Sequence, residues 1–163
     1  MPLLTAERAR ELLDYDPETG FFTWRAARGG KYKGSRAGGK GHHGYVVISI
    51  EGKVYYAHRI AWLITNGSWP PDDIDHVNGV NNDNRITNLR AVSHYVNQQN
   101  QRRPTAKNTS GFLGVSWDSS RESFAARIKS QGKLLYLGRY TNPDEAYQAY
   151  LTAKRDLHAG CTI

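Results

Sequence analysis

A polar, basic stretch at residues 102–110 most constrains how this chain can fold, because it separates two modules. It contains Pro104 and a run of Thr, Lys, Asn and Ser residues, which is typical of a linker. The 163 residues permit one ordinary domain or two small ones. We expect two domains, residues 1–101 and 111–163, each near the size at which a core is only marginally sufficient.

Hydrophobic periodicity predicts several short elements in the first module. Thr5 is suited to cap a helix that turns Ala9, Leu12 and Leu13 inward. Further apolar runs predict strands at 21–24, 45–50 and 53–57, the last two joined by a turn at 51–52, and a helix at 59–65. The intervening Gly-rich, Lys/Arg-rich residues 26–44 predict a loop or arm that packs no core and lets backbone approach a phosphate.

Residues 74–101 predict the order strand, loop, strand, helix. Ile74 to Val77 form a predicted short strand, Asn78-Gly79 starts a polar loop, and Ile86 to Val92 form a second predicted strand. Ser93 can then cap a helix that runs to about Gln101.

The second module predicts a three-stranded antiparallel sheet packed on one helix, with strands at 114–117, 124–129 and 134–140. Asn142, Pro143 and Glu145 form a strong helix start. We expect Ala146, Ala149, Tyr150, Ala153 and Leu157 to line one face of this helix and Gly160 to end it. The fold class of the whole chain is therefore predicted as α+β.

Basic charge is concentrated in two regions around a slightly acidic centre. The net charge is +7, and residues 25–40 and 103–163 carry the surplus. This pattern favours a polyanion binder with a metal site between two basic regions. A basic protein with an ordinary solvated surface remains the alternative, because charge alone does not separate the two.

Cys161 is the only cysteine, which excludes an internal disulfide and a cysteine-based zinc site. The first residues do not resemble a signal peptide, and the apolar runs are too short to span a membrane. We therefore expect a cytoplasmic protein without membrane or disulfide partners.

Phosphodiester hydrolysis requires a base for water and neutralisation of charge on the phosphate. Asp75 and His76 are adjacent on a predicted strand, so their side chains face opposite ways. One can bind a hard divalent ion while the other takes a proton from water. Asn97, one turn into the next helix, can close back on the strand. By spacing alone, an Asp-His pair is more often a surface pair than a catalytic one.

A longer string carries more weight. It runs from His58-Arg59 through Ile74-Asp75-His76-Val77-Asn78-Gly79 and Asp83-Asn84-Arg85-Ile86-Thr87-Asn88-Leu89-Arg90 to Asn97. Residues 10–101 resemble the phage-type HNH homing endonucleases, which have a ββα-metal active site, here about residues 74–101. The resemblance implies that His76 is the general base, Asp75 a metal ligand and Asn88 an orienting residue. Asn97 stands where many relatives have His; as a ligand it implies Mg²⁺ or Mn²⁺ rather than zinc.

Several residues of this string have alternative interpretations. A purely structural role is nearly as plausible for Asn88, and packing is slightly favoured for His58. His94 is a substitute candidate, one helical turn before Asn97. Arg85 and Arg90 could contact the scissile phosphate or pair with nearby aspartates. The loop asparagines 81, 82 and 84 are interpreted as loop formers.

Residues 110–158 resemble the APETALA2/ethylene-response-factor-type DNA-binding domain. The matching landmarks are Gly114-Val115, the strand 124–129, Tyr136-Leu137-Gly138 and the helix containing Asp144-Glu145-Ala146. The resemblance implies a sheet that enters the major groove, with Arg127, Lys129 and Tyr136 facing DNA. Tyr136 and Ser116 depart from the residues usual in that family, so base readout is expected to differ.

Together the resemblances imply a homing-type DNA endonuclease of a phage or prophage mobile element, acting on double-stranded DNA as a monomer or weak dimer in the host cytoplasm. DNA contacts are expected from one further set of side chains: Arg28, Lys31, Lys33, Arg36, Lys40, Arg85 and Arg90. The alternatives are a DNA-binding regulator with an idle nuclease site and a structure-specific nuclease for repair, recombination or packaging.

Overall fold

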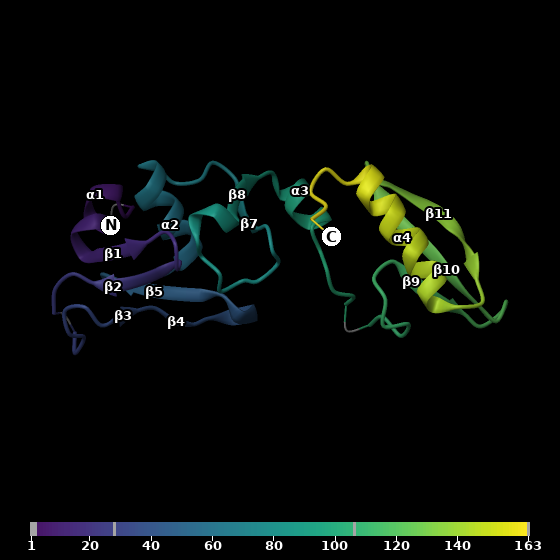
Figure 1. Cartoon of the computed structure of the whole chain (residues 1–163), viewed down its shortest axis with the longest axis horizontal. Helices are drawn as coiled ribbons and strands as arrows, with labels where there is room; N and C mark the ends of the chain where they lie inside the picture. Colours follow the sequence, from purple (N-terminus) through teal and green to yellow (C-terminus); the bar gives the residue numbers. More distant parts are fainter. Residues whose placement is uncertain (1–2, 28, 106, 163) are drawn as a thin grey trace. The chain divides into compact units, whose positions relative to one another are not determined.

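The chain forms two compact units, residues 1–94 and 95–163, each of which is described by itself (Figure 1). The computed structural model describes residues 3–27, 29–105 and 107–162. The predicted DNA contact Arg28 lies outside the described residues. Helices and small antiparallel sheets alternate along the chain, so the fold is α+β as predicted.

The first unit begins with a capped helix and a β-hairpin. Thr5 accepts a hydrogen bond from the Arg8 N–H at the start of α1 (Ala6–Leu12). The chain then enters β1 (Leu13–Asp16) directly, so Leu13 is a buried strand residue rather than the end of the predicted helix face. A turn leads to β2 (Phe21–Trp24), which pairs with β1.

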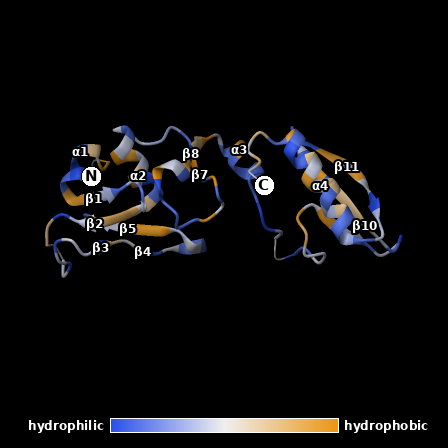
Figure 2. Cartoon of the chain, in the orientation of Figure 1, coloured by the Kyte–Doolittle hydropathy of each residue, from blue (hydrophilic) through white to orange (hydrophobic). Residues whose placement is uncertain are grey.

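A second hairpin and a helix supply most of the remaining core. Strands β5 (Val46–Ile50) and β6 (Lys53–Tyr56) pair across a tight turn. Helix α2 (Ala57–Asn66) follows at once and ends at Gly67, which adopts the left-handed conformation. Its buried face is Ala57, His58, Ile60, Ala61 and Leu63. Figure 2 shows the hydrophobic character of β5.

The prediction that residues 26–44 form only a loop is wrong in its second half. Two short strands, β3 (Arg36–Ala37) and β4 (Gly39–Lys40), add one strand each to the sheets of β1-β2 and β5-β6. Ala37 is buried in the core. A 3-10 turn, η1 (His42–Gly44), follows. These residues join the sheets through backbone hydrogen bonds, which the amino-acid composition of the segment does not indicate.

The last elements of the first unit form a two-stranded ribbon. Strand β7 (Asp73–His76) pairs antiparallel with β8 (Leu89–Val92), and a 3-10 turn, η2 (Ile86–Asn88), precedes β8. Residues 77–88, here called the β7–β8 loop, connect the strands. The register pairs Asp75 with Arg90 and His76 with Leu89.

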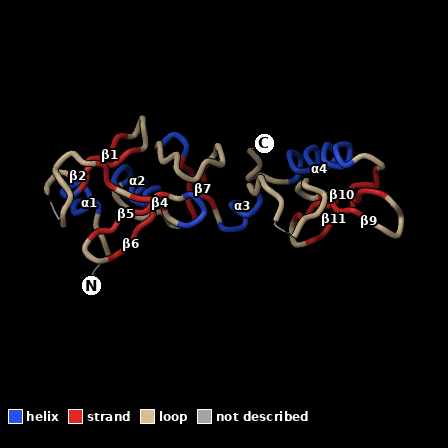
Figure 3. The backbone as a smooth tube through the Cα atoms, turned by 90° about the horizontal axis from the view of Figure 1, so that it is seen from below, coloured by secondary structure: helices blue, strands red, loops and turns tan. Residues whose placement is uncertain are grey.

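The second unit contains α3 residues beyond His94, a three-stranded sheet and α4. Helix α3 spans His94–Gln99. Strands β9 (Val115–Asp118), β10 (Ser123–Ser130) and β11 (Lys133–Tyr140) form a sheet in the order β11-β10-β9, and α4 (Pro143–Leu157) lies along one face (Figure 3). Asn142 caps α4 through its side-chain oxygen, as predicted. This matches the predicted arrangement of three strands packed on one helix.

The packed face of α4 differs from the prediction at its end. Ala146 and Tyr150 are buried as expected, but Leu157 is 42% exposed and Lys154 is fully buried. The Lys154 ammonium donates to the Gln101 carbonyl, and that partner makes burial of the charge tolerable. The helix ends at His158, two residues before Gly160.

In the described part of the chain, no helix is long and apolar enough to cross a membrane.

Candidate functional site

Strand β7 turns Asp75 and His76 to opposite sides, as the alternation of strand residues predicts. Asp75 faces its cross-strand partner Arg90, whose Nε and Nη2 donate to Asp75 Oδ2 at 2.9 and 2.7 Å. The Asp75 side chain is only 7% exposed, so a buried carboxylate is held by a charge-assisted pair.

His76 lies in a buried pocket of aromatic rings. The ring of His58 meets it edge-on at a centroid distance of 5.1 Å, and the ring of Tyr45 lies at 5.8 Å. Tyr45 also contacts His58 at 5.4 Å, and Tyr56 stacks on His58 at the same distance. These rings come from the residue before β5, from α2 and from β6, so several elements fix the position of the imidazole.

Burial keeps both imidazoles neutral. It lowers the pKa of His58 to about 3, with a further contribution from His76. Burial also lowers the pKa of His76 below its usual value, partly offset by the hydrogen bond to Asn84 and by nearby Asp75. A neutral imidazole near pH 7 is the form that can accept a proton.

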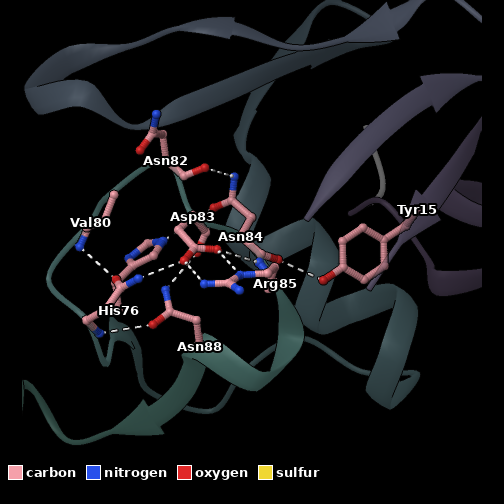
Figure 4. A network of polar contacts seen from close by, with 9 residues as sticks. Tyr15, His76, Val80, Asn82, Asp83, Asn84, Arg85 and Asn88 are labelled. Atoms are coloured by element: carbon pink, nitrogen blue, oxygen red, sulfur yellow. Dashed lines mark hydrogen bonds and ion pairs between the residues drawn. The ribbon is translucent and has the colours of Figure 1, made fainter. Parts of the chain in front are cut away.

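The hydrogen-bond partner of His76 is Asn84. Its Oδ1 lies 3.3 Å from His76 Nε2, and the Asn84 residue is 1% exposed. Figure 4 shows both side chains inside the curve of the β7–β8 loop, with Asp83 and Asn88 beside them.

Asn88 was predicted to orient the base or its loop, and its side chain forms hydrogen bonds within the loop. Its Oδ1 accepts from the Asn78 N–H at 2.9 Å, and its Nδ2 donates to the Asp83 carbonyl at 2.8 Å. Both partners are backbone groups, one near the start of the loop and one in its middle. The side chain therefore ties the loop closed, and any effect on His76 passes through that loop.

Arg85 and Arg90 both pair with aspartates, which was one of their two predicted roles. Arg85 donates to both carboxylate oxygens of Asp83, at 2.8 and 2.6 Å. These bonds hold the pKa of Asp83 at about 2, well below its usual value. A further pair joins His94 Nδ1 to Asp73 Oδ2 at 2.8 Å.

The chemistry around Asp75 fits a hard divalent ion. A carboxylate oxygen suits Mg²⁺, which usually takes one or two protein carboxylates and fills its remaining positions with water and phosphate. In residues 3–27, 29–105 and 107–162, no group of three or more His, Cys, Asp or Glu side chains could by itself hold a metal. The second predicted ligand, Asn97, is half-buried on α3 in the second unit, so the site here is built from the first unit alone.

The predicted DNA contacts of the basic arm are on the surface. Lys31, Lys33, Arg36 and Lys40 are exposed, and the Arg36 guanidinium lies over the Phe21 ring, 3.5 Å from its centroid. Tyr32, between the two lysines, is 79% exposed.

In the second unit, strand alternation separates the two faces of the sheet as predicted. Phe124 and Ala126 pack in a core cluster with Ala146 of α4, and Ile128 is buried, whereas Arg127 and Lys129 are exposed. Tyr136 is paired with Arg127 in the register and is 55% exposed. Arg139 joins this face, with its guanidinium 5.8 Å from the Tyr136 ring centroid.

Sequence reasoning missed three residues of the site: Tyr15, Tyr45 and the role of Asn84. Tyr15 donates its hydroxyl to the Asn84 carbonyl at 2.7 Å from 69 positions away. Burial raises the pKa of Tyr15 to about 12, so the donor proton stays in place. Only long-range packing brings these residues together, and no local signal in the sequence marks them.

Comparison with known proteins places this site in context. Residues 55–99 match the family model described as HNH endonuclease. "Protein 3.8" of Escherichia phage T7 is 34% identical over 77 residues, which is 47% of this chain and 63% of that relative. The aligned region therefore covers less than two thirds of the relative. No solved structure matches the chain. The matches support an HNH endonuclease domain at residues 55–99, a range that includes β7, the β7–β8 loop and β8.

Proposed function

We propose that this protein is a metal-dependent DNA endonuclease that hydrolyses phosphodiester bonds, with His76 as the general base. The observation that carries the proposal is a buried, neutral imidazole hydrogen-bonded by Asn84 and adjacent in sequence to the buried carboxylate of Asp75. The family match over residues 55–99 supports a nuclease rather than another use of this pair.

The imidazole accepts a proton from a water molecule as that water attacks the phosphorus atom in line with the leaving 3′ oxygen. The water oxygen forms the new P–O bond, and the bond to the 3′ oxygen breaks, which leaves a 5′-phosphate and, after protonation, a 3′-hydroxyl. General base catalysis of this kind contributes about 10²- to 10⁴-fold. The Tyr45 and His58 rings hold His76 in place during the transfer.

A hard divalent ion held at Asp75 would add the charge neutralisation that the side chains lack. Asp75 would hold Mg²⁺ or Mn²⁺, which when bound would supply charge neutralisation at the phosphate and at the leaving oxygen. Arg90 holds the carboxylate of Asp75 through Oδ2 and fixes its orientation.

Two basic surfaces would hold the duplex. One is the arm with Lys31, Lys33, Arg36 and Lys40; the other is the outer sheet face with Arg127, Lys129 and Tyr136. Lys and Arg side chains bind phosphates, whereas a sheet face can reach base edges in the major groove. The APETALA2-like interpretation of the second unit and a homing-type target site belong to this proposal, as does a phage or prophage origin, which the T7 relative supports.

A DNA-binding regulator with an idle nuclease site is the second candidate. The ion pair between Asp75 and Arg90 favours it, because a guanidinium already neutralises the carboxylate that would hold the metal. A working site requires that the ion bind despite this pair.

A plasmid assay separates the two candidates. The unmodified protein, His76→Ala, Asp75→Ala and, as an exposed-histidine control, His42→Ala are incubated with supercoiled DNA and Mg²⁺ or Mn²⁺. We expect the unmodified protein and His42→Ala to cut, and the other two to lose at least about 100-fold in rate. Binding without cleavage under every divalent ion tested would exclude the endonuclease, and normal cleavage by His76→Ala would exclude His76 as the base.

A further inference from the structure

The N-terminal hairpin of β1 and β2 holds the β7–β8 loop from outside. The Tyr15 hydroxyl donates to the Asn84 carbonyl at 2.7 Å, and the Ile86 N–H donates to the Pro17 carbonyl at 3.4 Å. Gly20 approaches the loop so closely that a Cβ atom there would lie 2.5 Å from the Arg85 nitrogen and 2.6 Å from the Asn84 carbonyl carbon. The hairpin therefore fixes the backbone at residues 84 and 85.

The Asn84 side chain has one orientation that satisfies its neighbours. Its Nδ2 donates to the Asn82 carbonyl at 3.5 Å, which directs Oδ1 toward His76 Nε2 at 3.3 Å. An amide oxygen accepts hydrogen bonds but cannot donate them. The hydrogen of this bond must therefore sit on Nε2 of the imidazole, which leaves the lone pair of the neutral ring on Nδ1.

We infer that Asn84 is a positioning residue that holds His76 in the Nε2–H tautomer with Nδ1 as the proton acceptor, and that Tyr15 and Gly20 fix Asn84 for this task. The inference rests on the proposed function only in its catalytic consequence. The tautomer itself is a property of the folded protein with or without DNA. Figure 4 shows the relay of contacts from Tyr15 through Asn84 to His76.

The other neighbours of His76 do not determine its tautomer through the contacts described. His58 and Tyr45 meet the imidazole through their rings, which restrict its position. Asn88 bonds backbone groups of the loop. Asn84 is thus the side chain whose chemistry distinguishes one ring nitrogen from the other, much as a hydrogen-bond partner sets the tautomer of a metal-bound or catalytic histidine elsewhere.

The first test needs no DNA cleavage, and a variant serves only to assign the signals. In ¹⁵N-labelled full-length protein at about pH 8, the ring nitrogen shifts of His76 distinguish the two neutral tautomers, and His76→Gln identifies its signals. We expect the shifts of an Nε2–H ring. A ring protonated on Nδ1 in the unmodified protein would overturn the inference, and this result is independent of whether the protein cuts DNA.

The second test compares two replacements of similar size. Asn84→Asp keeps an acceptor oxygen toward Nε2, whereas Asn84→Leu removes it. We expect Asn84→Leu to give a mixture of tautomers and to lower kcat about 10- to 100-fold with KM for DNA unchanged, because Asn84 is buried and reaches no DNA. Asn84→Asp should retain the Nε2–H tautomer and most of kcat.

Tyr15→Phe provides a milder perturbation that leaves the buried amide intact. Loss of one hydroxyl bond to the Asn84 carbonyl should lower kcat by a smaller factor than Asn84→Leu and leave KM unchanged. Unchanged tautomer and unchanged kcat in a folded Asn84→Leu protein would show that Asn84 only fills space. If Asn84→Leu does not fold, Tyr15→Phe and the tautomer of the unmodified protein still decide the matter.

Discussion

Replacing Gly20 with alanine tests whether the N-terminal hairpin fixes the β7–β8 loop. Gly20 has φ +73°, a conformation that costs an L-residue roughly 1–2 kcal/mol. A Cβ atom would also lie 2.5 Å from the Arg85 nitrogen, and overpacking of this kind costs about 1–3 kcal/mol when backbone must shift. Gly20→Ala should therefore lose about 2–5 kcal/mol of unfolding free energy.

Gly52 supplies a matched control. It has φ +78°, and nothing lies within 4 Å of where its Cβ would be. Gly52→Ala should thus lose only the conformational part, about 1–2 kcal/mol. Urea unfolding followed by tryptophan fluorescence measures both, and plasmid cleavage at saturating DNA measures kcat. Gly20→Ala should also lower kcat, whereas Gly52→Ala should not. Equal losses of stability and equal kcat in the two variants would refute the buttressing role of the hairpin.

Three further results are expected. Because the pKa of His58 is depressed in the folded protein, the unfolded chain takes up this proton first as pH falls, so the contribution of His58 to the unfolding free energy is full above about pH 6.5 and decreases toward pH 3. Between pH 7.5 and 5, urea unfolding should show that the unmodified protein loses about 2 kcal/mol more than His58→Leu. Parallel plots of unfolding free energy against pH for the two proteins would contradict this. Arg90→Met should cost about 3–5 kcal/mol because it removes the guanidinium that pairs with the buried Asp75 carboxylate, and adding Asp75→Asn should recover part of that loss. No recovery would refute the ion-pair account. DNA affinity should fall steeply as the salt concentration rises, and Arg127→Ala and Lys129→Ala should each reduce the slope of log affinity against log salt concentration by about 1. Unchanged slopes would exclude these side chains as phosphate contacts.

Local signals predicted most elements of the fold. The cap at Thr5, the hairpin at 51–52 and the helix start at Asn142 all depend on neighbouring residues, and each lies where the sequence indicates. Strand alternation likewise predicted which side of β10 faces the helix.

Long-range pairing was not predictable in the same way. Ala37 joins the core because a two-residue strand in a polar, Gly-rich region pairs with β2, which composition conceals. Lys154 is buried because one backbone carbonyl receives its ammonium group. Both depend on a partner distant in sequence.

The candidate site shows the same division. The string around Asp75 and His76 predicted a strand, and the structure places both residues on β7, within the range of the family match. Asn84 has the appearance of a loop former in the sequence, because its partners His76 and Tyr15 meet it only through the turn of the β7–β8 loop and the packing of the N-terminal hairpin.

Chemical rescue tests the central claim, that His76 is the general base, most directly. In His76→Gly, a small imidazole added to the solution can occupy the space of the missing ring and accept the proton of water. The account predicts that His76→Gly cuts DNA at least about 100-fold more slowly than the unmodified protein, and that imidazole restores part of the rate in a saturable way, with no effect on Asp75→Ala. A His76→Gly protein that cuts at the normal rate, or one that stays folded and binds DNA yet gains nothing from imidazole, would contradict it.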